Sequence, residues 1–402
     1  MANGETAILE RLVGSEALER AKAPLGEASG LGNLAYSDPL WLDLERRLLF
    51  SRSWTFAGNA RSLEPGSALP VWVAGLPLLL TRSEDQTLHA FHNVCRHRGS
   101  QVLDKPRTNL HTISCPYHAW TYGLDGRLVV RPHFWGGDQH DQPGPDVDAP
   151  GLLPVKVAQL FDWIFVNIDG QAAPFETLFE PIARRVAGYR LEAAKYAGSL
   201  SFRVACNWKL AVENWIEPYH VFAAHPRLHA FVKMRERQPS MVDGEVFWNF
   251  YQFKAPESGR GAGLPYFPNL TPELVRRGMW FTAFPNFSFE IYPDHIATFL
   301  ATPLAQDQTL ETIDIYLIGD AATAPEYAAQ RAAVQDMWRD LNAEDISIIE
   351  GLQKGRSSPG FAGDRFSPYW DEAVRRFAQL IMERMRPAAE MPSSSDHASA
   401  GR

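Results

Sequence analysis

Two short segments of the sequence combine cysteine and histidine at spacings that can hold a metal. The first is Cys95-x-His97 and the second is Cys115-x2-His118, and seventeen residues lie between His97 and Cys115. Thiolate sulfur and imidazole nitrogen are both common ligands of transition metals in proteins. Because each segment offers one of each, the sequence predicts a site with two sulfur and two nitrogen ligands.

Two kinds of metal centre use this ligand set. A Rieske [2Fe–2S] cluster has two cysteines on one iron and two histidines on the other, and the histidines raise its reduction potential. A structural zinc site can also take two cysteines and two histidines, but each segment then usually supplies like ligands. Here each segment mixes the two types, which favours the cluster. The cluster-binding candidates are Cys95, His97, Cys115 and His118.

A second group of candidate ligands lies in the segment 208–225, which has helical periodicity. His220 and His225 are five residues apart and would point in different directions on a straight α-helix. Pro218 within the segment, and a second proline directly after His225, predict a bent or broken helix. A break there would allow both imidazoles to reach one metal ion.

The same segment separates its apolar and polar side chains. Glu213, Glu217 and His220 share one side at 100° per residue. A polar face of this kind is ordinarily exposed to solvent. Glu217 and His220 are neighbours on that face, however, so the alternative is that they act together at a metal. The opposite, apolar side consists of Trp208, Val212, Trp215, Tyr219 and Phe222.

A carboxylate that could complete this second site lies in the predicted helix 324–354. Asp345 falls near the centre of the apolar stripe of that helix, and Glu344 lies at its edge. Burial of a carboxylate is costly unless it is paired or bound to metal. One interpretation is a salt bridge to a buried arginine. The other is a facial triad with His220 and His225, which is typical of non-haem Fe(II) oxygenases; Glu344 is then the alternative third ligand.

The elements that must position these residues differ between the two halves of the chain. From Trp54 to about Ile168, short β-type runs alternate with turns, which predicts a small antiparallel β domain. Beyond Gly170, helical and β-type stretches mix, which predicts an α+β domain around an antiparallel sheet. Further helices are expected at 5–24 and within 38–50. The helices expected in the second half are 177–189, 208–225, 271–277, 324–354 and 370–386.

Composition narrows the classes of function. A chain of 402 residues favours two domains. The net charge of −8 argues against a nucleic-acid partner. No apolar run is long enough for a membrane span. No secretory signal is visible at the N-terminus. Of three cysteines only Cys206 is left over, as a buried thiol, so we expect a cytoplasmic protein without disulfides. No dinucleotide-binding motif is present, so electrons must come from another protein.

Taken together, these motifs resemble the α subunits of Rieske non-haem iron oxygenases, also called ring-hydroxylating oxygenases. The resemblance covers nearly the whole chain. It implies an α+β protein with an N-terminal Rieske β domain and a helix-grip, START-like catalytic domain. We expect N-terminal helices at 1–50 that pack on the catalytic domain, the Rieske [2Fe–2S] domain at 51–169, the mononuclear-iron domain at 170–386 and a disordered tail at 387–402.

The resemblance also implies an assembly and a set of roles. Such chains form homotrimers, and the cluster of one subunit serves the iron of its neighbour. Glu217 would link His118 of one copy to His220 of the next, and Asn214 would lie near the iron without being a strong ligand. Glu213 and Tyr219 are expected to orient the ligands by hydrogen bonds. A separate NAD(P)H-dependent reductase carrying flavin and iron–sulfur groups would supply the electrons.

The substrate class is suggested by one departure from the commonest family pattern. Glu217 replaces the usual Asp and stands three residues after Asn214, as in the branch that hydroxylates or N-demethylates quaternary ammonium compounds such as carnitine, choline and glycine betaine. The alternative is hydroxylation or cis-dihydroxylation of an aromatic or heteroaromatic compound. Residues that could form a cation–π cage, an aromatic pocket or simply core are Trp215, Trp280, Phe284, Phe287, Phe289 and Tyr292.

Two other classes of function compete with an oxygenase. A Rieske protein that only transfers electrons would hold the cluster but would have no use for His220, His225 and Asp345. A ligand-binding protein stabilised by zinc would contain no iron. Metal content and colour would distinguish the three.

Overall fold

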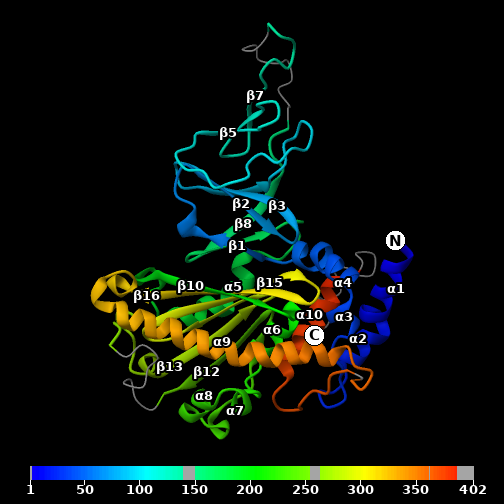
Figure 1. The fold of residues 1–402 in the computed structure, drawn as a ribbon, viewed down its shortest axis with the longest axis vertical. Coiled ribbons are helices and arrows are strands. Elements are labelled where there is room, and N and C mark those ends of the chain that lie inside the picture. Colours follow the sequence, from blue (N-terminus) through cyan, green and yellow to red (C-terminus); the bar gives the residue numbers. More distant parts are fainter. Residues whose placement is uncertain (1, 139–149, 254–262, 362, 387–402) are drawn as a thin grey trace, which may run out of the picture. The chain divides into compact units, whose positions relative to one another are not determined.

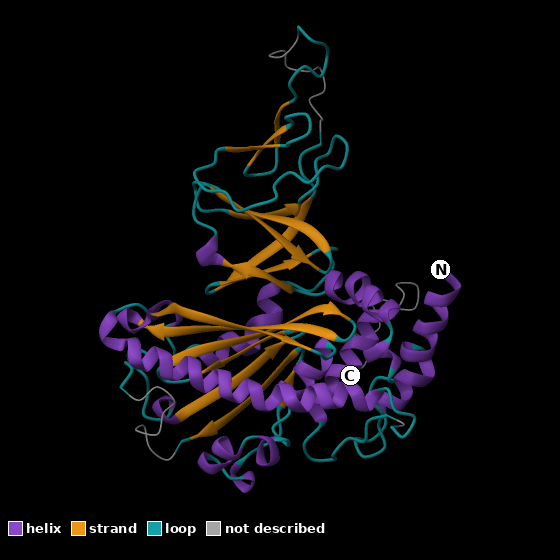
Figure 2. Cartoon of the chain, viewed as in Figure 1, coloured by secondary structure: helices purple, strands orange, loops and turns teal. Residues whose placement is uncertain are grey.

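The computed structural model describes residues 2–138, 150–253, 263–361 and 363–386 (Figures 1 and 2). The chain divides into two compact units, one from Phe50 to Phe175 and the other from the segments on either side of it. The sequence-based boundaries were 51 and 169. The predicted tail 387–402 lies outside the described residues.

The unit 50–175 is built from antiparallel β-sheets, as the alternation of short apolar runs and turns predicts. A six-stranded sheet has the order β1-β9-β8-β4-β3-β2, and a three-stranded sheet has the order β5-β6-β7. The strands are β1 (Thr55–Asn59), β2 (Ser67–Val73), β3 (Leu76–Arg82), β4 (Leu88–His92), β5 (Thr112–Ser114), β6 (Thr121–Gly123), β7 (Leu128–Val130), β8 (Pro154–Leu160) and β9 (Trp163–Asn167).

Strand β3 is buried on both of its faces, which explains its unbroken leucine run. Leu78 and Leu80 point into one apolar cluster, and Leu79 points into another that contains Cys95 and Cys115. Successive side chains of a strand point to opposite faces, so a strand with core on both sides needs apolar residues at every position. The apolar run therefore anchors the loops that carry the candidate cluster ligands.

The second unit contains a seven-stranded antiparallel sheet in the order β10-β16-β15-β14-β13-β12-β11. Neighbouring strands are mostly consecutive in the chain, so hairpins make most of the connections. The strands are β10 (Ala194–Val204), β11 (Met241–Asp243), β12 (Val246–Gln252), β13 (Arg277–Ala283), β14 (Phe287–Ile291), β15 (His295–Ala305) and β16 (Gln308–Ile318).

Helices cover this sheet, and the long helix α9 crosses it (Figure 2). α6 contacts both α9 and strand β15. The α+β class and the helix-grip arrangement are confirmed. The helices are α1 (Ala2–Val13), α2 (Ser15–Lys22), α3 (Leu34–Ser37), α4 (Pro39–Leu44), α5 (Phe175–Val186), α6 (Trp208–Ile216), α7 (Val221–Ala224), α8 (Pro226–Phe231), α9 (Ala328–Arg356) and α10 (Glu372–Met385).

Two of the predicted helices differ from the structure, and a third shows the predicted break. The stretch 5–24 is two helices that meet at Gly14, whose extended backbone caps α2. The stretch 271–277 contains only a 3₁₀ turn, Leu274–Arg276, and Arg277 already begins β13. The stretch 208–225 is broken after Ile216, as the proline argument predicts. Within the described residues, no helix is long and apolar enough to cross a membrane.

Candidate functional site

The two Cys–His segments form loops of similar backbone geometry. In the first, Gly99 N–H donates to the carbonyl of Cys95, and in the second, Ala119 N–H donates to the carbonyl of Cys115. Gly99 and Ala119 both have positive φ, at 77° and 53°. A left-handed conformation costs roughly 1–2 kcal/mol for a residue with a side chain, so the turn at Ala119 is maintained by its surroundings.

The sulfur atoms of the two cysteines are buried, whereas the two histidine rings lie closer to the surface of the unit. Cys95 and Cys115 are each 3% exposed and are free thiols, and His118 is exposed. The rings of His97 and His118 have centroids 4.6 Å apart. His97 also stacks on Trp120 at 4.8 Å, and its Nδ1 is buried without a hydrogen-bond partner among the described residues. An unpartnered buried nitrogen beside two buried thiols suits a metal cluster.

Tyr122 connects the cluster loops to the sheet. Its hydroxyl lies 3.2 Å from Cys95 Sγ and accepts a hydrogen bond from the Arg96 backbone N–H at 3.0 Å. Burial, and then the hydrogen bond to Cys95, raise the pKa of Tyr122 well above its usual value. The phenol therefore stays protonated and can donate to the sulfur, and such hydrogen bonds raise the reduction potential of an iron–sulfur cluster.

Helix α6 leads into the second candidate site, and contacts in the first turn of this helix fix its position. Asn207 caps the helix by accepting from Lys209 N–H. The ammonium of Lys209 lies 2.6 Å from Glu45, and both side chains are fully buried. Glu45 also accepts from the indole of Trp208 at 2.8 Å. Removing one member of such a buried pair leaves an uncompensated charge, so α6 is held firmly against the N-terminal segment.

The break after α6 turns the two histidines toward one point. Glu217 is extended, at φ −113° and ψ 129°, so the helix ends there. His220 then precedes α7, and His225 lies between α7 and α8, with Pro226 in the first helical position of α8. Proline is tolerated in that position because its missing N–H would have no helical partner.

Asp345 of α9 meets both imidazoles. Its Oδ1 lies 2.9 Å from His225 Nε2 and 3.6 Å from His220 Nε2. One ligand atom from each of the three residues lies within 4.8 Å of the others, and Asn214 Nδ2 donates to Asp345 at 2.8 Å. Two imidazole nitrogens and one carboxylate facing a common point fit a divalent iron. The structure thus brings together the three residues chosen from the sequence.

The outer nitrogens of both imidazoles contact glutamates. Glu217 Oε1 lies 2.6 Å from His220 Nδ1, and Glu344 Oε2 lies 2.7 Å from His225 Nδ1. A carboxylate on one ring nitrogen fixes the tautomer and orients the other nitrogen toward a metal. Glu344 therefore occupies a supporting position, while Asp345, its neighbour, faces the metal-ligand group.

The expectation that the side chains of Glu213 and Tyr219 orient the ligands is wrong. Glu213 accepts a hydrogen bond from Tyr36 at 2.6 Å and lies near Arg356. Burial raises the pKa of Glu213 to about 7, against the opposing effect of the Arg356 charge. This face of α6 is covered by the N-terminal segment, which a helical wheel cannot reveal.

The aromatic side of the predicted helix also differs from expectation. Tyr219 and Phe222 are 45% and 49% exposed, because they follow the break and no longer share a face with Trp215. The ring of Tyr219 stacks on Trp370. Its backbone N–H donates to the carboxylate of Glu217, so the contribution of Tyr219 near the site comes from its main chain.

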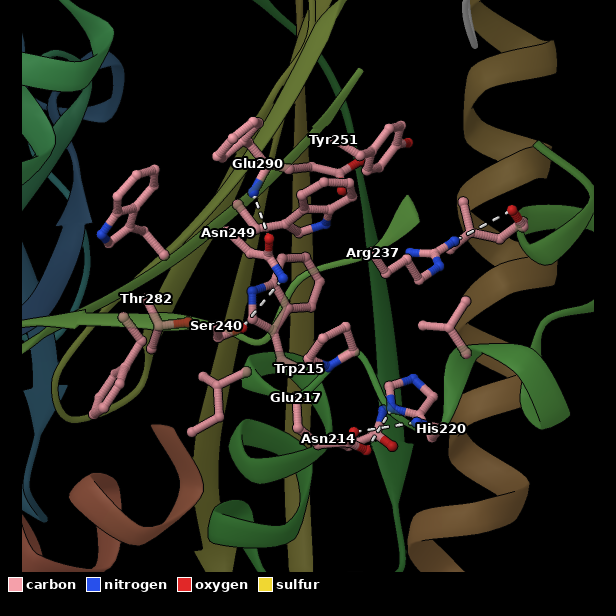
Figure 3. A pocket seen from close by; sticks show the side chains of 18 of the residues that line it. Asn214, Trp215, Glu217, His220, Arg237, Ser240, Asn249, Tyr251, Thr282 and Glu290 are labelled. Carbon is pink, nitrogen blue, oxygen red and sulfur yellow. Dashed lines mark hydrogen bonds and ion pairs between the residues drawn. The ribbon is translucent and has the colours of Figure 1, made fainter. Parts of the chain in front are cut away.

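A cavity of about 110 Å³ opens beside the metal-ligand group (Figure 3). Its wall on the sheet side has Asn249, Trp280 and Glu290 side by side on β12, β13 and β14. Trp215 closes another side and stacks on Phe299 and Trp338. The Phe, Tyr and Trp residues that line the cavity are Trp215, Phe247, Trp248, Phe250, Tyr251, Trp280, Phe281 and Trp338.

Only part of the predicted aromatic set lies on this cavity. Trp215 and Trp280 line it. The other four members are buried core residues outside the lining, namely Phe284, Phe287, Phe289 and Tyr292. Sequence reasoning missed Tyr251, Arg237 and Glu290. The alternation along β12 and β14 could have placed Tyr251 and Glu290 on one face of the sheet, but the order of the strands was not available.

Comparison with known families agrees with this geometry. Residues 53–135 match the Rieske [2Fe-2S] domain, and residues 191–387 match the catalytic domain of the ring hydroxylating alpha subunit. These matches exclude a zinc-stabilised binding protein and a protein limited to electron transfer. The cofactors are a [2Fe–2S] cluster and a mononuclear iron.

Curated relatives match most of the chain at low identity. The glycine betaine monooxygenase oxygenase subunit of Chromohalobacter salexigens is 28% identical over 393 residues, which cover 89% of this chain and 86% of the relative. The carnitine monooxygenase oxygenase subunit of Escherichia coli is 26% identical over 340 residues, with 82% and 84% covered. The chloroplastic choline monooxygenase of Beta vulgaris is 26% identical over 358 residues, with 87% and 76% covered.

Solved structures share the fold. A quaternary ammonium Rieske monooxygenase superimposes with a TM-score of 0.75 at 22% identity, covering 92% of this chain and 98% of that one. Naphthalene 1,2-dioxygenase from Rhodococcus sp. has a TM-score of 0.71 at 19% identity, with 94% and 98% covered. With its two matched domains and its two groups of metal ligands, the chain belongs to the Rieske non-haem iron oxygenases, as an α subunit that incorporates oxygen from O2.

Proposed function

We propose that this chain is the oxygenase component of an enzyme that oxidises a small quaternary ammonium compound. The observation that carries the proposal is the cavity beside His220, His225 and Asp345, whose lining includes eight Phe, Tyr and Trp side chains. A trimethylammonium group cannot donate a conventional hydrogen bond, and aromatic faces are the surfaces that recognise it best. The names of relatives that cover most of this chain agree with this substrate class.

Seven residues are assigned to the metal groups. Cys95, His97, Cys115 and His118 hold the cluster, and His220, His225 and Asp345 hold the iron. When bound, the cluster supplies electrons one at a time and the iron brings O2 to the substrate. Oxidation of an N-methyl group would give an unstable carbinolamine that releases formaldehyde.

The surrounding side chains position the reacting groups. Glu217 and Glu344 hold the imidazoles through their Nδ1 atoms. Asn214 donates to Asp345, which keeps one carboxylate oxygen in place and does not require the amide to be a strong ligand. Trp215 and Trp280 enclose the substrate and exclude water from the reacting carbon.

Electrons are proposed to reach the site from a second copy of the chain. His118 is exposed, so another copy can contact it, and the Glu217 carboxylate already contacts His220 at 2.6 Å. A homotrimer in which Glu217 also meets His118 of a neighbouring copy would place one carboxylate between the two histidines. A separate NAD(P)H-dependent reductase would feed the cluster. Two of the three cysteines are assigned to the cluster and Cys206 is a buried thiol, so no cysteine is assigned to a disulfide, which fits a reducing, cytoplasmic setting.

The second candidate function is oxidation of an aromatic compound. The same walls suit a flat ring, because Trp215 and Trp280 can pack against it by offset stacking. In that case one or both oxygen atoms would enter the ring.

Oxygen uptake by the iron-loaded, reduced protein tests the proposal. The panel contains carnitine, choline, glycine betaine, benzoate, phthalate and an N-heterocycle, and the products are identified by mass. The proposal predicts turnover of a trimethylammonium compound with release of formaldehyde or another aldehyde. Turnover restricted to aromatic compounds would overturn the substrate class and retain the oxygenase.

A further inference from the structure

Arg237 contributes to the wall of the active-site cavity although it has no part in metal binding. The residue is 9% exposed and lines the cavity. Its Nε donates to the carbonyl of Val232 at 3.2 Å, and its Nη2 donates to the carbonyl of Leu228 at 3.3 Å. Figure 3 shows the side chain between Tyr251 and His220. Backbone contacts at the end of α8 therefore hold the guanidinium in a defined orientation at the cavity.

The charge of Arg237 is unusual for this cavity. Among the described residues that line it, Arg237 is the only lysine or arginine, whereas Glu217, Glu290 and Asp345 are acidic. Glu217 and Asp345 contact the metal-binding histidines, but Glu290 lies apart from them on β14, beside Trp280. The cavity thus presents a cation and an anion at positions separate from the metal ligands.

The two charged residues are linked by a pair of tyrosines. The Arg237 guanidinium lies 5.9 Å from the ring centroid of Tyr251. The hydroxyl of Tyr251 is 2.7 Å from that of Tyr292, which donates to Glu290 at 3.4 Å. Glu290 is 1% exposed. Both charges lie at the cavity, so a ligand that carries a carboxylate and a cationic group would present a complementary charge to each of them.

A purely cationic substrate does not match this arrangement. A buried guanidinium disfavours a second positive charge nearby, because like charges interact strongly at low dielectric. A substrate that carries a trimethylammonium group and a carboxylate offers a complementary charge to both features. Guanidinium is also the side-chain group best suited to a carboxylate, since its planar donors can bind both oxygens.

We propose that Arg237 binds the carboxylate of a zwitterionic trimethylammonium substrate. The chain then prefers betaine-type compounds to the corresponding alcohols and esters, with the cationic group held by the aromatic walls. This inference rests on the proposed function and adds the substrate subclass to it.

The test compares ligands that differ only in the acidic group. Dissociation constants of glycine betaine, its methyl ester and choline are measured by calorimetry with the anaerobic, metal-loaded protein, and kcat/KM is measured in parallel. We expect the acid to bind about 10- to 100-fold more tightly than the ester or the alcohol, the range for a hydrogen-bonded charge. Arg237→Gln should remove this preference, and the conservative Arg237→Lys should retain part of it.

Arg235→Gln is the matched control, because it removes the same charge from an exposed residue two positions away. Its preference for the acid should equal that of the unaltered protein. Equal affinity of the unaltered protein for acid, ester and alcohol would overturn the inference without requiring any variant to fold. Preserved selectivity in Arg237→Gln would overturn it as well. Failure to bind any of the three would overturn the inference, and the absence of turnover of every trimethylammonium compound in the oxygen-uptake panel would overturn the proposed function as well.

Discussion

His225 Nδ1 lies 2.7 Å from Glu344 Oε2, while its Nε2 faces Asp345 Oδ1 at 2.9 Å. Two consecutive residues of α9 therefore contact opposite edges of one imidazole ring. His220 is arranged in a similar way, with Glu217 Oε1 2.6 Å from its Nδ1 and Asp345 Oδ1 3.6 Å from its Nε2. A carboxylate at each Nδ1 favours the tautomer of the histidine that leaves Nε2 able to bind the proposed iron.

Glu344→Ala should weaken iron binding without removing a ligand. Loss of an outer carboxylate typically lowers metal affinity 10- to 100-fold, because the imidazole is no longer oriented and is less basic. Glu344→Gln should have a smaller effect, since the amide oxygen still accepts the Nδ1 proton. The measurement is retention of Fe(II) against a competing chelator. Equal retention in all three proteins would show that Glu344 does not support the site.

Glu217→Gln should slow electron delivery while leaving the iron in place. The amide can still accept from His220 but carries no charge, and a charged acceptor stabilises the imidazole more strongly. The rate of cluster oxidation after mixing with substrate and O2, followed by absorbance, should fall by at least tenfold. Asn214→Ala is a useful comparison, because it disturbs Asp345 and leaves the contact between Glu217 and His220 intact. An unchanged rate in Glu217→Gln would remove Glu217 from the electron path.

Trp280→Ala should raise KM for a trimethylammonium substrate by about 3- to 30-fold, the range expected when a cation–π contact is lost. Trp280→Phe should recover part of the affinity. A neutral tert-butyl analogue, used as a competitive inhibitor, separates this contribution from simple apolar contact. If both variants weaken the neutral and the charged compound equally, Trp280 contributes packing alone.

Glu213 should make the stability of the catalytic unit depend on pH. Burial raises the pKa of Glu213 to about 7 from its usual 4.5, so the folded state retains a proton that the unfolded state loses first. This stabilising contribution is complete below about pH 4.5 and is lost as the pH rises through about 7.

Glu213→Gln tests this dependence because the amide mimics the protonated acid at every pH. Relative to the variant, the melting temperature of the unaltered protein should fall by a few degrees between pH 5.5 and pH 8. Parallel pH profiles for the two proteins would show that Glu213 does not titrate in this range.

Local chemistry in the sequence suggested the candidate metal ligands, because each Cys–His segment mixes two ligand types at a metal-binding spacing. His220 and His225 could be grouped only by expecting the helix to break between Glu213 and His225, and the structure brings both close to Asp345. Pro218 predicted the broken helix because proline has no backbone N–H to donate and its ring clashes with the preceding turn of a helix. The sequence could not show that the N-terminal segment covers Glu213, because that contact joins Tyr36 to a residue 177 positions away.

The cavity was harder to predict than the ligands for a related reason. Trp280 and Glu290 are neighbours only because β13 and β14 pair in one register. Arg237 reaches the cavity from an irregular segment after α8, where no periodicity exists to place it. Phe284, which directly follows β13, and Phe287, which begins β14, were attractive candidates by type, but both side chains are buried in the core. Residue type therefore suggested the substrate class, whereas sheet order decides which residues contact the substrate.

The most direct test of the account is product formation in a single turnover by the reduced, iron-loaded protein and by Asp345→Ala. The account predicts product from the unaltered protein, none from Asp345→Ala, and the same cluster spectrum in both, because the cluster ligands lie in the other unit. Asp340→Ala, which removes an exposed carboxylate from the same helix, should behave like the unaltered protein. Product from Asp345→Ala at the rate of the unaltered protein would contradict the assignment of the iron site.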